Sequence, residues 1–325
     1  MQQRVKEFMA QIDQTLSPHK FTGFVHAGWR HQTNASAGPN DLTVRALGQD
    51  ATLNSQSGKN PDWNKFITGG AGYTYEVSDK LWLETSFLGY YAKQDKLSQF
   101  DLGLAELQVG PRFAIPLPGG SMKIYGIGTM AVLAEDPYYR GPGAGVSMRF
   151  PVDNLARFEF SYEYRDRQYK DSLDYPTASE LTGKLHTVAS TAEGVLFGVL
   201  PYSARGALDW NRTDRAVDNF NSYDRVSADL AFPIPFTIPW FDEPRQAVFT
   251  PAAGVSRTNY LAPNILIDPD IARLDKEWHV SASLDVQIYG NFGLRTQVYY
   301  TRTTSSLPNF DMDNLAVSFG PTVRF

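Results

Sequence analysis

The sequence predicts an all-β fold: a transmembrane antiparallel up-and-down β-barrel of about fourteen strands, within a range of twelve to sixteen. Apolar and polar residues alternate with a period of two in many successive segments, as in strands with one apolar face. No run approaches about 18 consecutive apolar residues, which excludes a transmembrane helix. The mean hydropathy of −0.33 fits a barrel, because only one face of each strand meets lipid.

Composition narrows the class of protein further. A length of 325 residues suits one large barrel domain. The absence of cysteine excludes disulfides and thiolate metal sites. The net charge of −5 is spread along the chain without a basic stripe, so we expect no nucleic-acid partner.

Residues 1–20 form the first predicted domain, a short amphipathic helix on the periplasmic side. Apolar residues at spacings of three and four support it: Val5, Phe8, Met9, Ile12 and Leu16. The Ser17-Pro18 step then ends the pattern. The segment lacks the apolar core of a secretory signal, so we expect a mature or truncated chain. The helix is either the end of a missing periplasmic domain or a plug at the barrel mouth.

Residues 21–325 form the second predicted domain, the barrel itself. The expected strands cover 21–33, 66–77, 80–93, 101–115, 123–133, 143–150, 156–165, 181–191, 196–210, 225–232, 247–258, 276–288, 293–303 and 313–325. In the clearest internal strand Phe158 and Phe160 alternate with Glu159 and Ser161. The last strand alternates to the end of the chain, where Phe325 lies in register with its apolar face.

The predicted connections differ in length at the two ends of the barrel. Those at 78–79, 151–154, 192–194 and 289–291 are short, whereas those after the first, seventh, ninth, eleventh and thirteenth strands are long and polar. Such asymmetry is typical of outer-membrane barrels, with short periplasmic turns and long outer loops. Residues 233–246 are too rich in proline for a central strand. They are either a periplasmic insertion or the sign of a miscounted strand.

The final strand resembles the C-terminal strand of bacterial outer-membrane β-barrels. In that class a terminal Phe is part of the signal read by the barrel assembly machinery, so the resemblance implies this role for Phe325. It also implies a place in the outer membrane, contact with lipid and lipopolysaccharide, and both termini in the periplasm.

A narrower resemblance starts at Phe21-Thr22-Gly23-Phe24 and the loop 34–39. These segments are similar to barrels that follow periplasmic tetratricopeptide repeats, among them the surface lipoprotein assembly modulator (Slam) family. That resemblance implies a conduit or gate for export of lipoprotein or polysaccharide cargo, served by a tetratricopeptide domain. A passive porin-like channel and a barrel hydrolase are the alternatives.

Charged residues on the polar strand faces are the candidate lumen lining. They are Arg157, Glu159, Glu163, Arg165, Arg167, His279, Asp285 and Arg295. Their chemistry fits either a selectivity constriction or a set of mutual ion pairs that fills a narrow barrel.

We expect no catalytic residue, cofactor or metal. A Ser–His–acid set could be drawn from His279, Ser281 and Asp285, but polar residues are the default lining of a lumen. Asp268, Asp270 and Asp275 form an acidic loop that does not match an EF-hand, since Arg273 takes the sixth position where glycine is needed.

Overall fold

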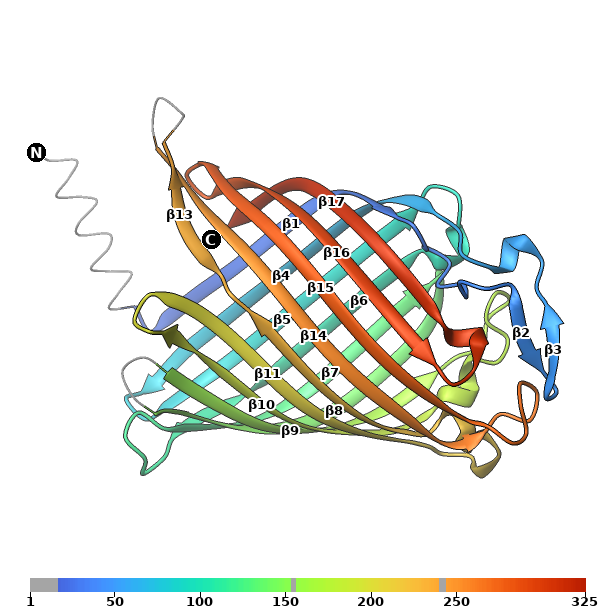
Figure 1. Cartoon of the computed structure of the whole chain (residues 1–325). Helices are drawn as coiled ribbons and strands as arrows, with labels where there is room; N and C mark the ends of the chain where they lie inside the picture. The colour runs from blue at the N-terminus through green and yellow to red at the C-terminus, as the bar shows by residue number, and fades with distance from the viewer. Residues whose placement is uncertain (1–16, 153–155, 240–243) are drawn as a thin grey trace, which may run out of the picture.

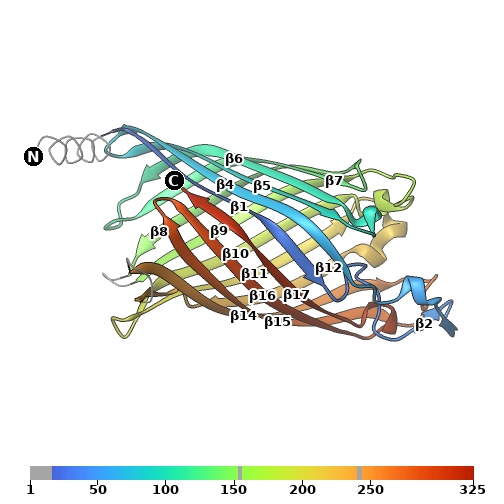
Figure 2. The ribbon, with the colours of Figure 1, turned by 90° about the horizontal axis from the view of Figure 1, so that it is seen from above.

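The computed structural model describes residues 17–152, 156–239 and 244–325, and the predicted N-terminal helix lies almost entirely outside them. The described chain is a closed antiparallel β-barrel of fourteen strands (Figures 1 and 2). The described residues contain no helix long and apolar enough to cross a membrane.

Each barrel strand pairs with its neighbours in the chain, so the topology is up-and-down as predicted. The strands are β1 (His19–Gln32), β4 (Asp62–Ser78), β5 (Leu81–Gln94), β6 (Leu102–Ala114), β7 (Ser121–Leu133), β8 (Asp136–Pro151), β9 (Ala156–Tyr169), β10 (Gly183–Leu196), β11 (Leu200–Thr213), β12 (Tyr223–Ala231), β14 (Arg245–Pro263), β15 (Ala272–Tyr289), β16 (Phe292–Ser305) and β17 (Met312–Arg324). β1 pairs with β17 and so closes the barrel.

The outer face of the barrel is apolar because alternate side chains of every strand point outward. On β15, Trp278, Val280 and Leu284 are 44%, 45% and 37% exposed, whereas Ser283 and Asp285, on either side of Leu284, are buried. A continuous exposed apolar surface of this kind needs lipid rather than water around it. Aromatic rings pair on this face, as Trp29 does with Phe319.

Several strand boundaries differ from the prediction, and two of the differences lie at turns with positive φ. β8 begins at Asp136 rather than at residue 143, because a two-residue turn at Ala134 and Glu135, both with positive φ, joins it to β7. The turn expected at 192–194 is wrong: β10 continues to Leu196, and the chain reverses at Phe197 and Gly198, again with positive φ. Two residues with positive φ give a turn the twist of the two strands that it joins. Such a turn can contain apolar residues such as Ala134 and Phe197, so a search for polar residues does not find it.

Part of the proline-rich segment forms a strand that extends past the rim. β13 (Ile234–Ile238) continues the β12–β14 ladder without a register shift, and Phe232 N–H donates to the Pro251 carbonyl at 3.0 Å. β13 pairs with β14 alone, so its other edge is free within the described chain. The hairpin projects at the end of the barrel where the chain termini lie (Figure 1).

The long connections lie at the opposite end, which we call the loop rim. The longest, residues 33–61, contains the small hairpin β2 (Thr43–Ala46) and β3 (Gln49–Thr52). This hairpin extends away from the barrel wall (Figures 1 and 2). The 3-10 turns η1 (Ser55–Ser57), η2 (Ser98–Phe100), η3 (Ala178–Leu181), η4 (Ala216–Asn221) and η5 (Pro308–Phe310) also belong to connections on this rim.

Candidate functional site: the charged barrel interior

Ion pairs between strands that are not neighbours identify the inward face. Arg165 on β9 donates to Glu106 on β6 and lies 2.8 Å from the Thr129 hydroxyl on β7. Its guanidinium also meets Glu163 at 2.8 Å. Side chains on strands β6 and β9 converge only on the concave side of the wall, because outward-pointing side chains of a barrel diverge.

A second group continues this network toward the end with the termini. Arg112 on β6 lies 2.7 Å from Glu84 on β5 and 3.8 Å from Glu159 on β9. Glu159 also receives Arg149 at 2.7 Å, and Lys123 lies 3.3 Å from Glu84. Acids and bases alternate here, so this wall is close to neutral in charge.

The predicted lining residues therefore occupy different surroundings. Glu159, Glu163 and Arg165 belong to the network just described. Arg167 lies nearer the loop rim, where it donates to Asn211 at 2.5 Å. Arg157 pairs with Glu193 at 2.5 Å near the opposite end, and both side chains are about half exposed.

The remaining predicted residues lie on the opposite wall. His279 Nε2 is 3.4 Å from Asp229 Oδ1, and its ring stacks on Tyr299 at 5.4 Å. Asp285 meets Arg324 at 2.8 Å and Arg295 at 3.7 Å. His279 and Asp285 lie six residues apart on one strand, about 20 Å, so the structure does not assemble them into a Ser–His–acid site.

Five charged network members were missing from the predicted set: Glu84, Glu106, Arg112, Lys123 and Arg149. Each occupies a position whose side chain points into the barrel, and it pairs with an inward-pointing residue of the next strand, as Arg112 does with Lys123. The signal was therefore present in the alternation. It was harder to find because these strands carry single charges rather than the continuous ladder of β9.

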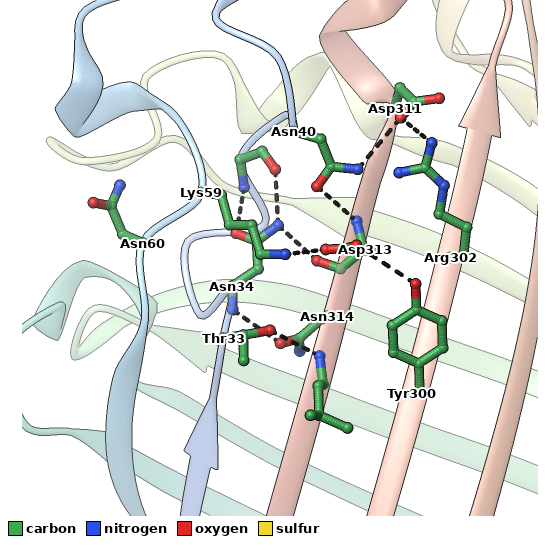
Figure 3. Close-up of polar contacts among 12 residues, drawn as sticks. Thr33, Asn34, Asn40, Lys59, Asn60, Tyr300, Arg302, Asp311, Asp313 and Asn314 are labelled. Atoms are coloured by element: carbon green, nitrogen blue, oxygen red, sulfur yellow. Dashed lines mark hydrogen bonds and ion pairs between the residues drawn. The ribbon is translucent and has the colours of Figure 1, made fainter.

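The loop rim is held by a second polar cluster (Figure 3). The buried Asn34 donates through its side chain to the Asp313 carbonyl at 3.1 Å, and its backbone N–H donates to Asn314 at 3.0 Å. Lys59 pairs with the Asp313 carboxylate, and Asp313 N–H donates to Asn40 at 3.2 Å. These bonds fasten the 33–61 connection to β17.

The acidic loop of the sequence belongs to the same rim. Asp268 is 2% exposed and pairs with Arg45 at 3.0 Å, while Asp275 pairs with Arg273 at 2.6 Å. The Asp270 backbone N–H, at 3.0 Å, and the Arg45 guanidinium hold the pKa of the Asp268 carboxyl below its usual value. Within the described ranges no group of three acids or histidines is arranged to hold a metal ion.

Phe325 lies on the outside of the barrel at the rim with the termini. Its ring stacks on Phe21 at 5.4 Å and is about half exposed. Its backbone exchanges two hydrogen bonds with Gly23, at 2.7 and 3.0 Å. A side chain at the Gly23 position would meet the Phe325 ring at 2.5 Å, so glycine leaves the space that this ring occupies.

Comparison with known proteins gives structural matches only. No family model and no curated protein matches the sequence. Among solved structures, the chain is similar to a bacterial polysaccharide outer membrane secretin (10% identity, 94% and 98% of the two chains covered, TM-score 0.42). Others are the outer membrane protein OprD (9%, 95% and 94%, 0.42) and a FadL homologue (10%, 94% and 90%, 0.43), both from Pseudomonas aeruginosa. Similarity at these TM-scores supports neither a fold nor a function, so the fold assignment rests on the strand pairing of the chain itself.

Proposed function

We propose that this protein is an outer-membrane channel that conducts small polar and charged solutes through its barrel. The observation that carries the proposal is the meeting of charged side chains from non-neighbouring strands inside a closed barrel with an apolar exterior. In Figures 1 and 2 no described segment outside the strands runs through the interior. A polar lumen without a crossing segment is the arrangement of a water-filled channel.

The proposed orientation places the short-turn rim in the periplasm and the loop rim outside the cell. The strand order and connection lengths support it, since outer-membrane barrels have short periplasmic turns. Phe325 would then be available to the barrel assembly machinery at the periplasmic rim, and the apolar band would contact lipid and lipopolysaccharide.

Conductance in planar lipid bilayers tests the channel proposal. The purified protein is expected to produce steady single-channel steps in potassium chloride. Reconstituted protein that shows the heat-modifiable gel migration of a folded barrel and yet gives no steps would overturn the proposal.

Export is the second candidate. The geometry that favours it is the start of β1 at the same rim as Phe325, where the Glu76 N–H donates to the Pro18 carbonyl at 2.8 Å. A tetratricopeptide domain attached before β1 would lie beside the barrel mouth and could deliver lipoprotein or polysaccharide cargo. A barrel that stays closed in bilayers until such a domain and its cargo are added would favour export over free diffusion.

A further inference from the structure

The barrel interior contains a recess whose lining differs from the ion-pair network. It has a volume of about 570 Å³ and is bounded by strands β16, β17, β1, β4 and β5. This size lies within the range of about 300–1,000 Å³ that is usual for small-molecule pockets. The lining includes Phe24, Leu88, Gly70, Arg295 and Arg324.

The recess has an apolar part on a strand face that is mostly polar. Phe24 and Leu88 have inward parity, since they pair with Gly70 and alternate with outward residues such as Val25 and Phe87. They are 36% and 45% exposed, although no lipid reaches them there. A side chain at Gly70 would lie 2.7 Å from the Phe24 ring, so glycine lets this ring lie along the wall. Exposed apolar surface inside a pocket is a binding surface for an apolar group.

The recess also has an uncompensated positive charge. Arg295 and Arg324 share a single carboxylate, Asp285, at 3.7 and 2.8 Å. Two guanidinium groups against one side-chain carboxylate leave one positive charge among these three side chains. Arg295 Nε is buried and has no hydrogen-bond acceptor, a state that costs free energy until an acceptor arrives.

We propose that this recess binds monocarboxylates that carry an apolar body, such as aryl-alkyl acids. The carboxylate would accept hydrogen bonds from Arg295 and Arg324, a geometry that guanidinium groups favour. The apolar body would cover Phe24 and Leu88 above Gly70. This site deepens the proposed channel function and rests on it, because the ligand reaches the recess through the lumen.

Equilibrium dialysis of the folded protein in a neutral detergent, with radiolabelled 3-phenylpropionate, tests the site. Saturable binding is expected. Arg295→Gln and Arg324→Gln should each weaken it at least tenfold, while Asp285→Asn should strengthen it severalfold by freeing both guanidinium groups. Arg157→Gln is the matched control, because it removes an inward arginine outside the recess and should leave binding unchanged.

Competition on the unaltered protein keeps the test independent of how the variants fold. 3-Phenylpropanamide has the apolar body without the charge, and acetate has the charge without the body, so both should compete at least tenfold more weakly than the acid. Equal competition by either one, or weaker binding in Asp285→Asn, overturns the proposal. Binding without conductance would contradict the channel function alone, and conductance without binding would contradict this site alone.

Discussion

At the scale of single residues, the direction in which a strand side chain points determines how much an introduced charge destabilises the barrel. Val280 lies near the middle of β15 and points outward, 45% exposed, whereas Ser281 beside it points inward. Val280→Arg should destabilise the barrel by about 2–4 kcal/mol or block its assembly, because it places a basic charge near the membrane midplane. Ser281→Arg is the matched control and should be tolerated. Urea unfolding of both variants in lipid vesicles measures the difference, and equal stabilities would contradict the assigned outward face.

Asp268 provides a second residue-scale prediction, on pH. Its folded-state pKa is lowered by the Asp270 N–H and by Arg45. The lowered pKa stabilises the folded rim at pH values above the unfolded pKa of about 3.9. That contribution is lost as the pH falls through the still lower folded pKa. Hydrogen exchange of residues 43–52 should therefore accelerate as the pH falls below about 4, after correction for intrinsic rates.

Two variants control the pH experiment. Asp268→Asn should show fast exchange at neutral pH with little further change on acidification. Asp50 also pairs with Arg45 but is 73% exposed, so Asp50→Asn should keep the pH dependence. Acid-dependent exchange that persists in Asp268→Asn would assign the effect to another group.

At the scale of elements, β13 shows how proline protects a free strand edge. Phe232 N–H points toward β14, so by strand alternation the nitrogens of residues 233, 235, 237 and 239 face the free edge. Three of these four residues are proline, which has no N–H to donate. Exposed edges invite pairing with another chain, and proline prevents it.

Pro235→Thr restores a donor on that edge and should increase self-association of the folded protein. Chemical cross-linking in detergent should show a severalfold larger dimer fraction than for the parent. Ile234→Thr is the control, since its N–H already faces β14 and it adds no edge donor. A dimer fraction that rises equally in both variants would point to exposed side chains rather than to the edge.

The elements also show what the sequence can and cannot predict. Alternation located all fourteen strands, because a lipid-facing side chain and a lumen-facing one differ in polarity at every step. Alternation did not locate the turns at Ala134 and Phe197, because backbone conformation with positive φ, and not side-chain polarity, determines where the chain reverses there. The proline-rich 233–246 segment was interpreted correctly as unsuited to a central strand, but its role as an edge beyond the rim depends on the length of β14, which sequence pattern does not fix.

In the barrel interior, too, the sequence predicts which side chains point inward but not which of them meet. The pattern of β9 indicated which charges face inward. Two of their partners, Arg112 and Glu106, come from β6, which is not a neighbour of β9 and is brought close to it by the curvature of the barrel. The Asp285–Arg324 contact likewise joins β15 to β17 across an intervening strand. Such pairs cannot be deduced from local periodicity, because they depend on closure of the barrel.

At the scale of the whole molecule, the balance of charge in the lumen should set ion selectivity. Arg165 is held between Glu106 and Glu163, and this group carries one excess negative charge. Arg165→Gln removes the only base of this group and raises the excess to two negative charges. The channel should therefore become more cation-selective, because fixed charges in a pore attract counter-ions. The reversal potential in a potassium chloride gradient across a planar bilayer measures this shift.

A paired variant separates charge from damage to the wall. Arg165→Gln combined with Glu106→Gln and Glu163→Gln removes one positive and two negative charges, leaving a neutral group of similar shape. Its selectivity should move to the opposite side of the parent protein, toward anions. If both variants shifted the reversal potential in the same direction, the change would reflect altered packing of the wall, and the ions would not be passing beside Arg165.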